Sequence, residues 1–139
     1  MDSHRRGARP LVTSLAVLGL AAATFAAWWL WLGSDHTYQV DPATGTTTGP
    51  YEPAQVVGCV VTLAALAVLG NLVLRPWLAV VTMTATFVAG WSTDAATTDE
   101  SGLWLVGSIM LALGMAAGTA VVSVVVTALR RRRQRRDDR

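Results

Sequence analysis

The chain has 139 residues, of which 53% are apolar and 14% are charged, and its formal net charge is +2. Globular domains carry about 25% charged residues, so this composition argues against an ordinary water-soluble domain. The length leaves room for one small domain only.

Four stretches without a charged side chain predict four membrane-spanning helices. They cover residues 11–32, 54–74, 77–93 and 102–129. A hydrocarbon core of roughly 30 Å is crossed by about 20 helical residues, and each stretch is at or near that length. We therefore expect an all-α membrane protein, a four-transmembrane-helix bundle.

The first predicted span, residues 11–32, follows a short basic segment, residues 1–10. A basic segment before an apolar stretch also describes a cleaved secretory signal. However, the stretch exceeds the roughly 7–15 apolar residues of such a signal, and it ends in Trp28, Trp29 and Trp31, which suit a membrane interface. We expect an uncleaved first span.

Residues 33–53 form a first polar loop with a turn sequence at its centre. Asp41 can cap the turn, Pro42 presets φ, and Gly45 supplies a positive φ. Alternating residues on both sides predict a small β-hairpin from Thr37 to Thr48. An isolated hairpin is marginal in water, so it would have to dock on the helices or on lipid headgroups.

The remaining spans differ in length and in how they are joined. The link at residues 75–76 is so short that spans 54–74 and 77–93 form an antiparallel helical hairpin. A second polar loop, residues 94–101, precedes the last span. That span, residues 102–129, would be roughly 40 Å long as a helix, so we expect it to tilt or to extend past the membrane.

Charges divide between the two ends of the predicted bundle. The N-terminal segment, the short link and the tail, residues 130–139, hold all 11 basic residues, and every one of them is arginine. The two longer loops hold no arginine. They carry the acidic residues Asp35, Asp41, Glu52, Asp94, Asp99 and Glu100. Short basic loops remain cytoplasmic, so we expect a multi-pass protein of the cell membrane with both termini in the cytoplasm.

The tail, residues 130–139, follows directly on the last span and is rich in arginine. Anionic lipid headgroups attract such residues by about 1 kcal/mol each, so we expect the tail to anchor the helix on lipid phosphate. Nucleic acid is not an expected partner, because the tail offers charge without aromatic side chains or a fold of its own. An acidic protein partner remains an alternative.

The predicted spans hold little that could perform chemistry. Proton relays and ion-coupled carriers place ionisable groups at depth, and the small multidrug-efflux carriers need a glutamate in the first span, where residues 11–32 have none. Asn71 is expected to bond to a neighbouring helix. The single cysteine, Cys59, excludes an internal disulfide and a site of several thiolates, so we expect it in the core.

The outer loops contain a weak candidate for a metal site. Carboxylates and one imidazole fall there at loose spacing, in Asp35, His36, Asp94, Asp99 and Glu100. We interpret them as a solvated acidic surface. His4 and His36 are predicted on opposite sides of the membrane, which argues against a serine–histidine–acid arrangement. We predict no catalytic, cofactor or metal site, and no enzyme.

Small and hydroxylic residues form two faces on the last span. Gly107, Gly114 and Gly118 share one face, and Gly114 and Gly118 match the glycine-x-x-x-glycine pattern. Hydroxyls lie four residues apart on the opposite face, at Thr119, Ser123 and Thr127. Close approach and weak hydrogen bonds hold membrane helices together. The faces therefore predict packing within the chain, or contact with a second copy or another membrane protein.

The overall pattern resembles small four-span integral membrane proteins of high-GC bacteria that have no known activity. The residues that carry the resemblance are Tyr38–Asp41, Gly49–Glu52 with Gln55–Val57, Leu74–Trp77 and Gly102–Trp104. We expect a structural or accessory protein that acts through helix packing or outer-loop contacts. The alternative is a small oligomeric channel or carrier, suggested by the hydroxyl faces.

Overall fold

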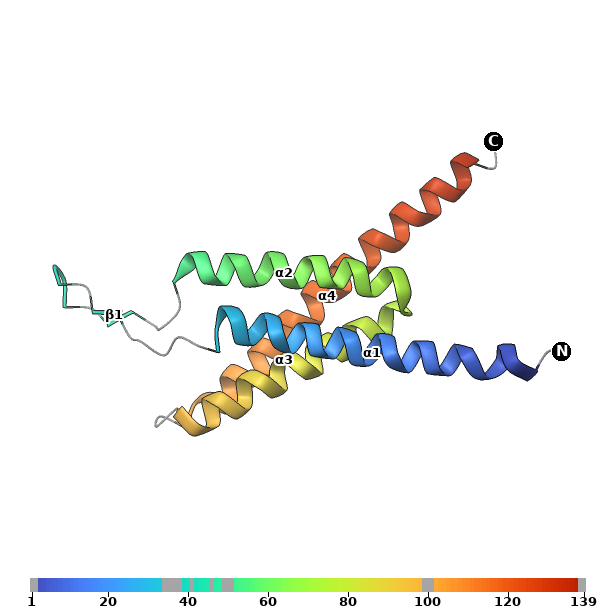
Figure 1. Cartoon of the computed structure of the whole chain (residues 1–139). Coiled ribbons are helices and arrows are strands. Elements are labelled where there is room, and N and C mark those ends of the chain that lie inside the picture. Colours follow the sequence, from blue (N-terminus) through green and yellow to red (C-terminus); the bar gives the residue numbers. More distant parts are fainter. Residues whose placement is uncertain are drawn as a thin grey trace.

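Four helices make up most of the chain in a computed structural model, which describes residues 3–33, 39–40, 42–45, 47–48, 52–98 and 102–137. Their bounds are α1 Ser3–Trp31, α2 Pro53–Val73, α3 Pro76–Thr98 and α4 Trp104–Asp137. The helices pack against one another (Figure 1). The prediction of an all-α protein of four packed helices is confirmed.

A short β pair lies between α1 and α2. Strands β1 (Gln39–Val40) and β2 (Thr47–Thr48) are antiparallel, with Gln39 opposite Thr48 and Val40 opposite Thr47. Gly45, in the turn between them, has φ of 67°, the positive value expected there. The rest of the predicted hairpin, including Thr37 and Asp41, lies outside the described residues.

The junction between α2 and α3 is set by local backbone bonds and a proline. The N–H of Leu74 donates to the Gly70 carbonyl at 2.7 Å and ends α2. Pro76 opens α3, at a position where its missing N–H costs no helical bond. The N–H groups of Leu78 and Ala79 then donate to the Arg75 carbonyl. The two helices therefore reverse direction almost without a loop.

Three helices extend beyond the predicted spans. Helix α1 begins at Ser3 and so contains Pro10. Helix α3 continues to Thr98, into the predicted loop 94–101, where threonine hydroxyls donate to carbonyls one turn back. Helix α4 continues through the arginine tail to Asp137. Arginine is a good helix former, and positive charge near a helix C-terminus is favourable.

Helices α2 and α3 lie in the middle of the arrangement. Each of them contacts the other three helices, whereas within the described residues α1 and α4 do not contact each other. Ala79, Met83 and Phe87 of α3 form the most buried row of the core, and Met83 is 0% exposed. The start of α1, the α2–α3 link and the end of α4 lie at one end, and the β pair lies at the other (Figure 1).

The surface and the interior have the reverse of a water-soluble distribution. Large apolar side chains are exposed along α1, α2 and α4, among them Leu18, Leu30, Val73, Met110 and Leu113. Several polar side chains are buried, namely Thr24, Asn71, Ser108, Thr119 and Ser123. Soluble monomers rarely expose apolar patches of this extent. This surface is suited to contact with lipid.

Three of the described helices are long and apolar enough to cross a membrane, judged by length and composition. The candidate spans are Pro10–Trp31, Pro53–Val73 and Trp104–Arg136. They indicate a multi-pass membrane protein. Helix α3 is not among the candidates. Its apolar run is interrupted by Thr82, Thr84 and Thr86 and is followed closely by Asp94.

Glycines let bulky side chains from neighbouring helices approach the backbone. A Cβ added to Gly58 would lie 2.5 Å from the Trp31 ring, and one added to Gly107 would lie 2.7 Å from Trp91. A Cβ added to Gly90 of α3 would lie 3.0 Å from Trp28 of α1, which is only 4% exposed. Each of these glycines therefore serves as the recess that receives an indole.

Two hydroxyl contacts add hydrogen bonds between helices. The Trp31 Nε1–H of α1 donates to Thr62 Oγ1 of α2 at 3.1 Å. The hydroxyls of Ser92 in α3 and Ser108 in α4 are 2.8 Å apart, and Ser108 also donates to the Trp104 carbonyl. Ser92 is thus the donor between the two helices. Such bonds hold helices together where no hydrophobic force acts between them.

The recess at Gly90 predicts a position-dependent cost of enlarging a glycine. Gly90→Leu should destabilise the protein by about 1–3 kcal/mol, because Trp28 is buried and has little room to move. Gly19→Leu on α1 is the matched control, because a Cβ there meets nothing within 4 Å. Thermal unfolding in mild detergent, followed by tryptophan fluorescence, measures both. Equal melting temperatures would contradict the packing at Gly90.

Candidate functional site

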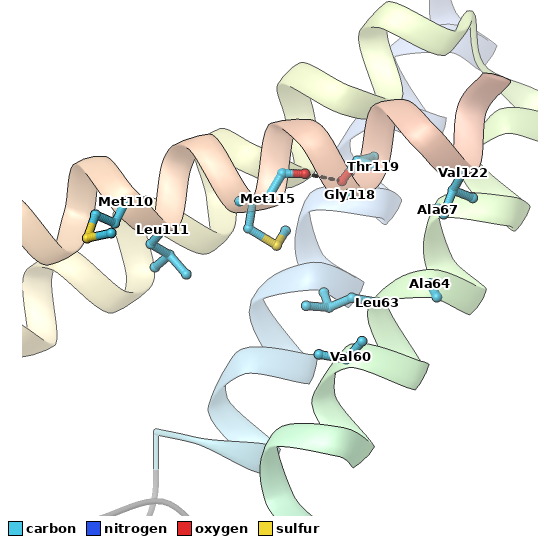
Figure 2. Close-up of a pocket in the computed structure, with 11 residues that line it drawn as sticks. Val60, Leu63, Ala64, Ala67, Met110, Leu111, Met115, Gly118, Thr119 and Val122 are labelled. Atoms are coloured by element: carbon cyan, nitrogen blue, oxygen red, sulfur yellow. Dashed lines mark hydrogen bonds between the residues drawn. The ribbon is translucent and has the colours of Figure 1, made fainter. Parts of the chain in front are cut away.

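An apolar groove runs between α2 and α4 (Figure 2). Its volume is about 440 Å³. Val122 and Ala67 lie close together at one end, and the helices diverge toward Met110 and Val60. Its walls are formed by Val60, Leu63, Ala64, Ala67, Met110, Leu111, Gly114, Met115, Gly118, Thr119 and Val122. We call it the α2–α4 groove.

The glycine pair of α4 lies in the α2–α4 groove and is not covered. A Cβ added to Gly114 or Gly118 would meet nothing within 4 Å. Gly107, on the same face, differs because Trp91 covers it. The glycine-x-x-x-glycine pattern is therefore not used for close helix packing within the described part of the chain.

The hydroxyl face of α4 points into the bundle and bonds to its own helix. Thr119 donates to the Met115 carbonyl at 2.7 Å, Ser123 to the Thr119 carbonyl at 2.9 Å, and Thr127 to the Ser123 carbonyl at 2.8 Å. Thr119 and Ser123 are buried. This bonding to the preceding turn satisfies the hydroxyl donors without another helix.

Asn71, which was expected to bond to a neighbouring helix, bonds to its own helix instead. The side-chain Nδ2 of Asn71 donates to the Ala67 carbonyl of its own helix at 2.7 Å, and its Oδ1 has no partner among the described residues. The connection to a neighbouring helix runs through the backbone instead. Arg130 of α4 donates to the carbonyls of Asn71 and Leu72, at 3.3 and 3.2 Å.

Arg130 therefore caps the C-terminal end of α2. The last carbonyls of a helix have no intrahelical partner, and they carry the negative end of the helix dipole. A guanidinium presents several donors in a fixed plane and is always charged. The arginine cluster was expected to contact lipid as a whole, and the cap on α2 was not expected. The only sequence signal for that role is that Arg130 is the first arginine after the apolar run.

The tryptophans do not all lie at the outer surface of the bundle. Trp28, predicted with its neighbours to face the membrane interface, is buried against Gly90 and packs beside Phe25, with 5.3 Å between ring centroids. Trp29 and Trp77 are exposed, as an interfacial position requires. Hydropathy alone could not distinguish Trp28 from Trp29, because the two residues have the same side chain and are adjacent at the same end of α1.

The remaining candidate residues do not come together as a site. Cys59 is buried in α2, consistent with a core position. Among the outer-loop group, Asp94 lies in α3, and Asp35, His36, Asp99 and Glu100 lie outside the described residues. Within the part of the chain that the structure describes, no three His, Cys, Asp or Glu side chains converge.

Comparison with models of known protein families, with curated proteins and with solved structures finds no match to this chain. The features of the chain that bear on function are an apolar exterior, an uncovered glycine pair in a groove, and an arginine that joins α4 to the end of α2.

Proposed function

We propose that the chain crosses the cell membrane four times, with both termini in the cytoplasm. The support is the relation between α2 and α4. Arg130, near the end of α4, contacts the last carbonyls of α2, and the same two helices line the α2–α4 groove further back along each. They therefore run parallel. If both cross the membrane, α3 must return through it to connect them.

The modest hydropathy of α3 is compatible with a crossing. Three helices pack around it, so its threonines are partly shielded, and only a narrow stripe that includes Val81 and Ala85 is exposed. A helix shielded by protein needs less apolar surface than one surrounded by lipid. The orientation rests on the arginines, which are absent from the two longer loops.

The biochemical role that we propose is that of a structural or accessory protein, which acts through a helix–helix contact at the α2–α4 groove. The observation that carries it is a contrast among glycines. Gly58, Gly70, Gly90 and Gly107 each have a bulky side chain from another helix against them, whereas Gly19, Gly114 and Gly118 have none. Of these three, only Gly114 and Gly118 form a pair one turn apart on the same face. Uncovered small residues permit the close approach that joins membrane helices. No catalytic activity is proposed.

The channel hypothesis gains no support from the hydroxyl face. Thr119, Ser123 and Thr127 direct their donors to carbonyls of α4, and the large groove is lined by apolar and small residues. Within the described residues, the hydroxyls line no polar passage. A contact surface is therefore the role that we carry forward.

The four-crossing topology predicts an alternation of sides along the chain. Reporter fusions at Gly45 and Thr97 should be active outside the cytoplasm, and fusions at Arg75 and at the C-terminus should be active inside. Paired reporters, one active only outside and one fluorescent only in the cytoplasm, measure this in intact cells. Arg75 and Thr97 on the same side would show that α3 does not cross.

The uncovered glycine pair predicts a partner at the α2–α4 groove. A photo-cross-linking residue at Met110, which is exposed and lines the groove, should give an adduct of discrete mass in intact membranes. The double variant Gly114→Leu/Gly118→Leu should strongly reduce that adduct, because leucine fills the recess.

Gly19→Leu is the control, because Gly19 is also a helical glycine with open space around it. It should leave the adduct unchanged. The absence of any adduct at Met110, or an adduct that survives the double variant, would overturn the proposed contact.

A further inference from the structure

A second groove lies at the end of the bundle that carries the α2–α3 link. It is formed where α3 begins and where the apolar part of α4 ends, and its volume is about 310 Å³. Its lining residues are Pro76, Ser123, Val124, Thr127, Ala128 and Arg131. We call it the lower groove. It combines an apolar wall with a single guanidinium.

The charge and the apolar wall lie at different depths. Arg130 contacts the carbonyls at the end of α2, so Arg131, the next residue, lies at the level where α2 ends and α3 begins. Ser123 is eight residues earlier in α4, about 12 Å along the helix axis. In the proposed crossing, this places the guanidinium at the polar border and the wall within the hydrocarbon region.

The electrostatics of the lower groove favour an anion at its polar end. Arg131 is exposed and has no hydrogen bond or ion pair to the described residues, whereas Arg130 is engaged with α2. Pro76 is the first residue of α3, so the positive end of that helix dipole lies beside the groove. A guanidinium and the positive end of a helix dipole therefore lie beside the groove, and an acidic side chain is not among the lining residues.

The deeper wall offers no free donor. The hydroxyls of Ser123 and Thr127 donate to carbonyls of α4, at 2.9 and 2.8 Å, which leaves Val124 and Ala128 to define an apolar surface. A ligand with an anionic headgroup and an apolar chain would match this groove, which has a guanidinium at one end and an apolar wall deeper in the membrane. A soluble phosphate would contact only the end of the groove at Arg131, and an apolar peptide would leave the guanidinium of Arg131 without a partner.

We propose that the lower groove binds one anionic glycerophospholipid, with its phosphate on Arg131 beside the start of α3 and an acyl chain along Val124 and Ala128. This goes beyond a general attraction between the arginine tail and the membrane, because it assigns one residue and one groove. It rests on the proposed membrane crossing.

The test measures lipid retained by the full-length protein released from nanodiscs of equal phosphatidylglycerol and phosphatidylcholine, by native mass spectrometry. The wild-type chain should retain phosphatidylglycerol in preference. Arg131→Gln should lower that preference by more than the about five-fold loss that removal of any basic residue at an anionic surface causes. Val124→Trp, which keeps every charge, should displace the lipid by filling the groove.

Two control variants distinguish a specific lipid site from a general attraction between the arginine tail and the membrane. Arg135→Gln removes the same charge from an exposed position outside the lower groove, and Val121→Trp adds the same ring at an exposed position of α4 outside it. Val121→Trp should retain lipid as the wild type does, and Arg135→Gln should lose clearly less of the preference than Arg131→Gln does. Equal losses in the two arginine variants, or no loss in Val124→Trp, would overturn the proposal.

Two further outcomes separate this proposal from its alternatives. Excess soluble glycerol 3-phosphate should not displace the lipid, and displacement would show a phosphate site that needs no acyl chain, which overturns the proposal. A chain that fails to enter nanodiscs would refute the membrane crossing itself. A chain that enters them but shows no preference for phosphatidylglycerol would refute the lower-groove site alone.

Discussion

The constraint on which this structure depends is that the hydrocarbon core of a bilayer holds no water to bond with exposed backbone groups. A chain in that solvent must satisfy its N–H and C=O groups internally, and long helices do so. Apolar side chains then face outward without penalty, which explains why leucine, valine and methionine cover α1, α2 and α4 while threonine and serine are buried.

Because lipid tails are as apolar as leucine, burial of leucine does not drive these helices together. Fit and a few polar contacts replace it. The indoles of Trp28, Trp31 and Trp91 pack against glycines on neighbouring helices. Arg130 of α4 caps the C-terminal end of α2. Helix α3 contacts the other three helices, so the exposed surface along its middle is small.

The sequence predicted the features that depend on the solvent around the chain, such as the positions of the helices. It did not predict the features that depend on contacts between neighbouring helices. Uncharged runs predicted four helices, and the Asp-Pro turn predicted a positive φ at Gly45. Hydropathy placed Trp28 at the membrane interface, although Trp28 is buried against Gly90 of α3. The candidate site was only half predicted, since the Gly114–Gly118 pattern was visible but its open groove depends on how α4 diverges from α2.

The most direct measurement of the solvent around this chain is spin-label accessibility in reconstituted bilayers. Single cysteines at Ala85 on α3 and Leu113 on α4, in a Cys59→Ala background, would carry the label, with Thr97 as a reference near the end of α3. The account predicts that oxygen reaches Ala85 and Leu113 and that a water-soluble nickel chelate reaches only Thr97. Nickel access at Ala85 equal to that at Thr97 would contradict it.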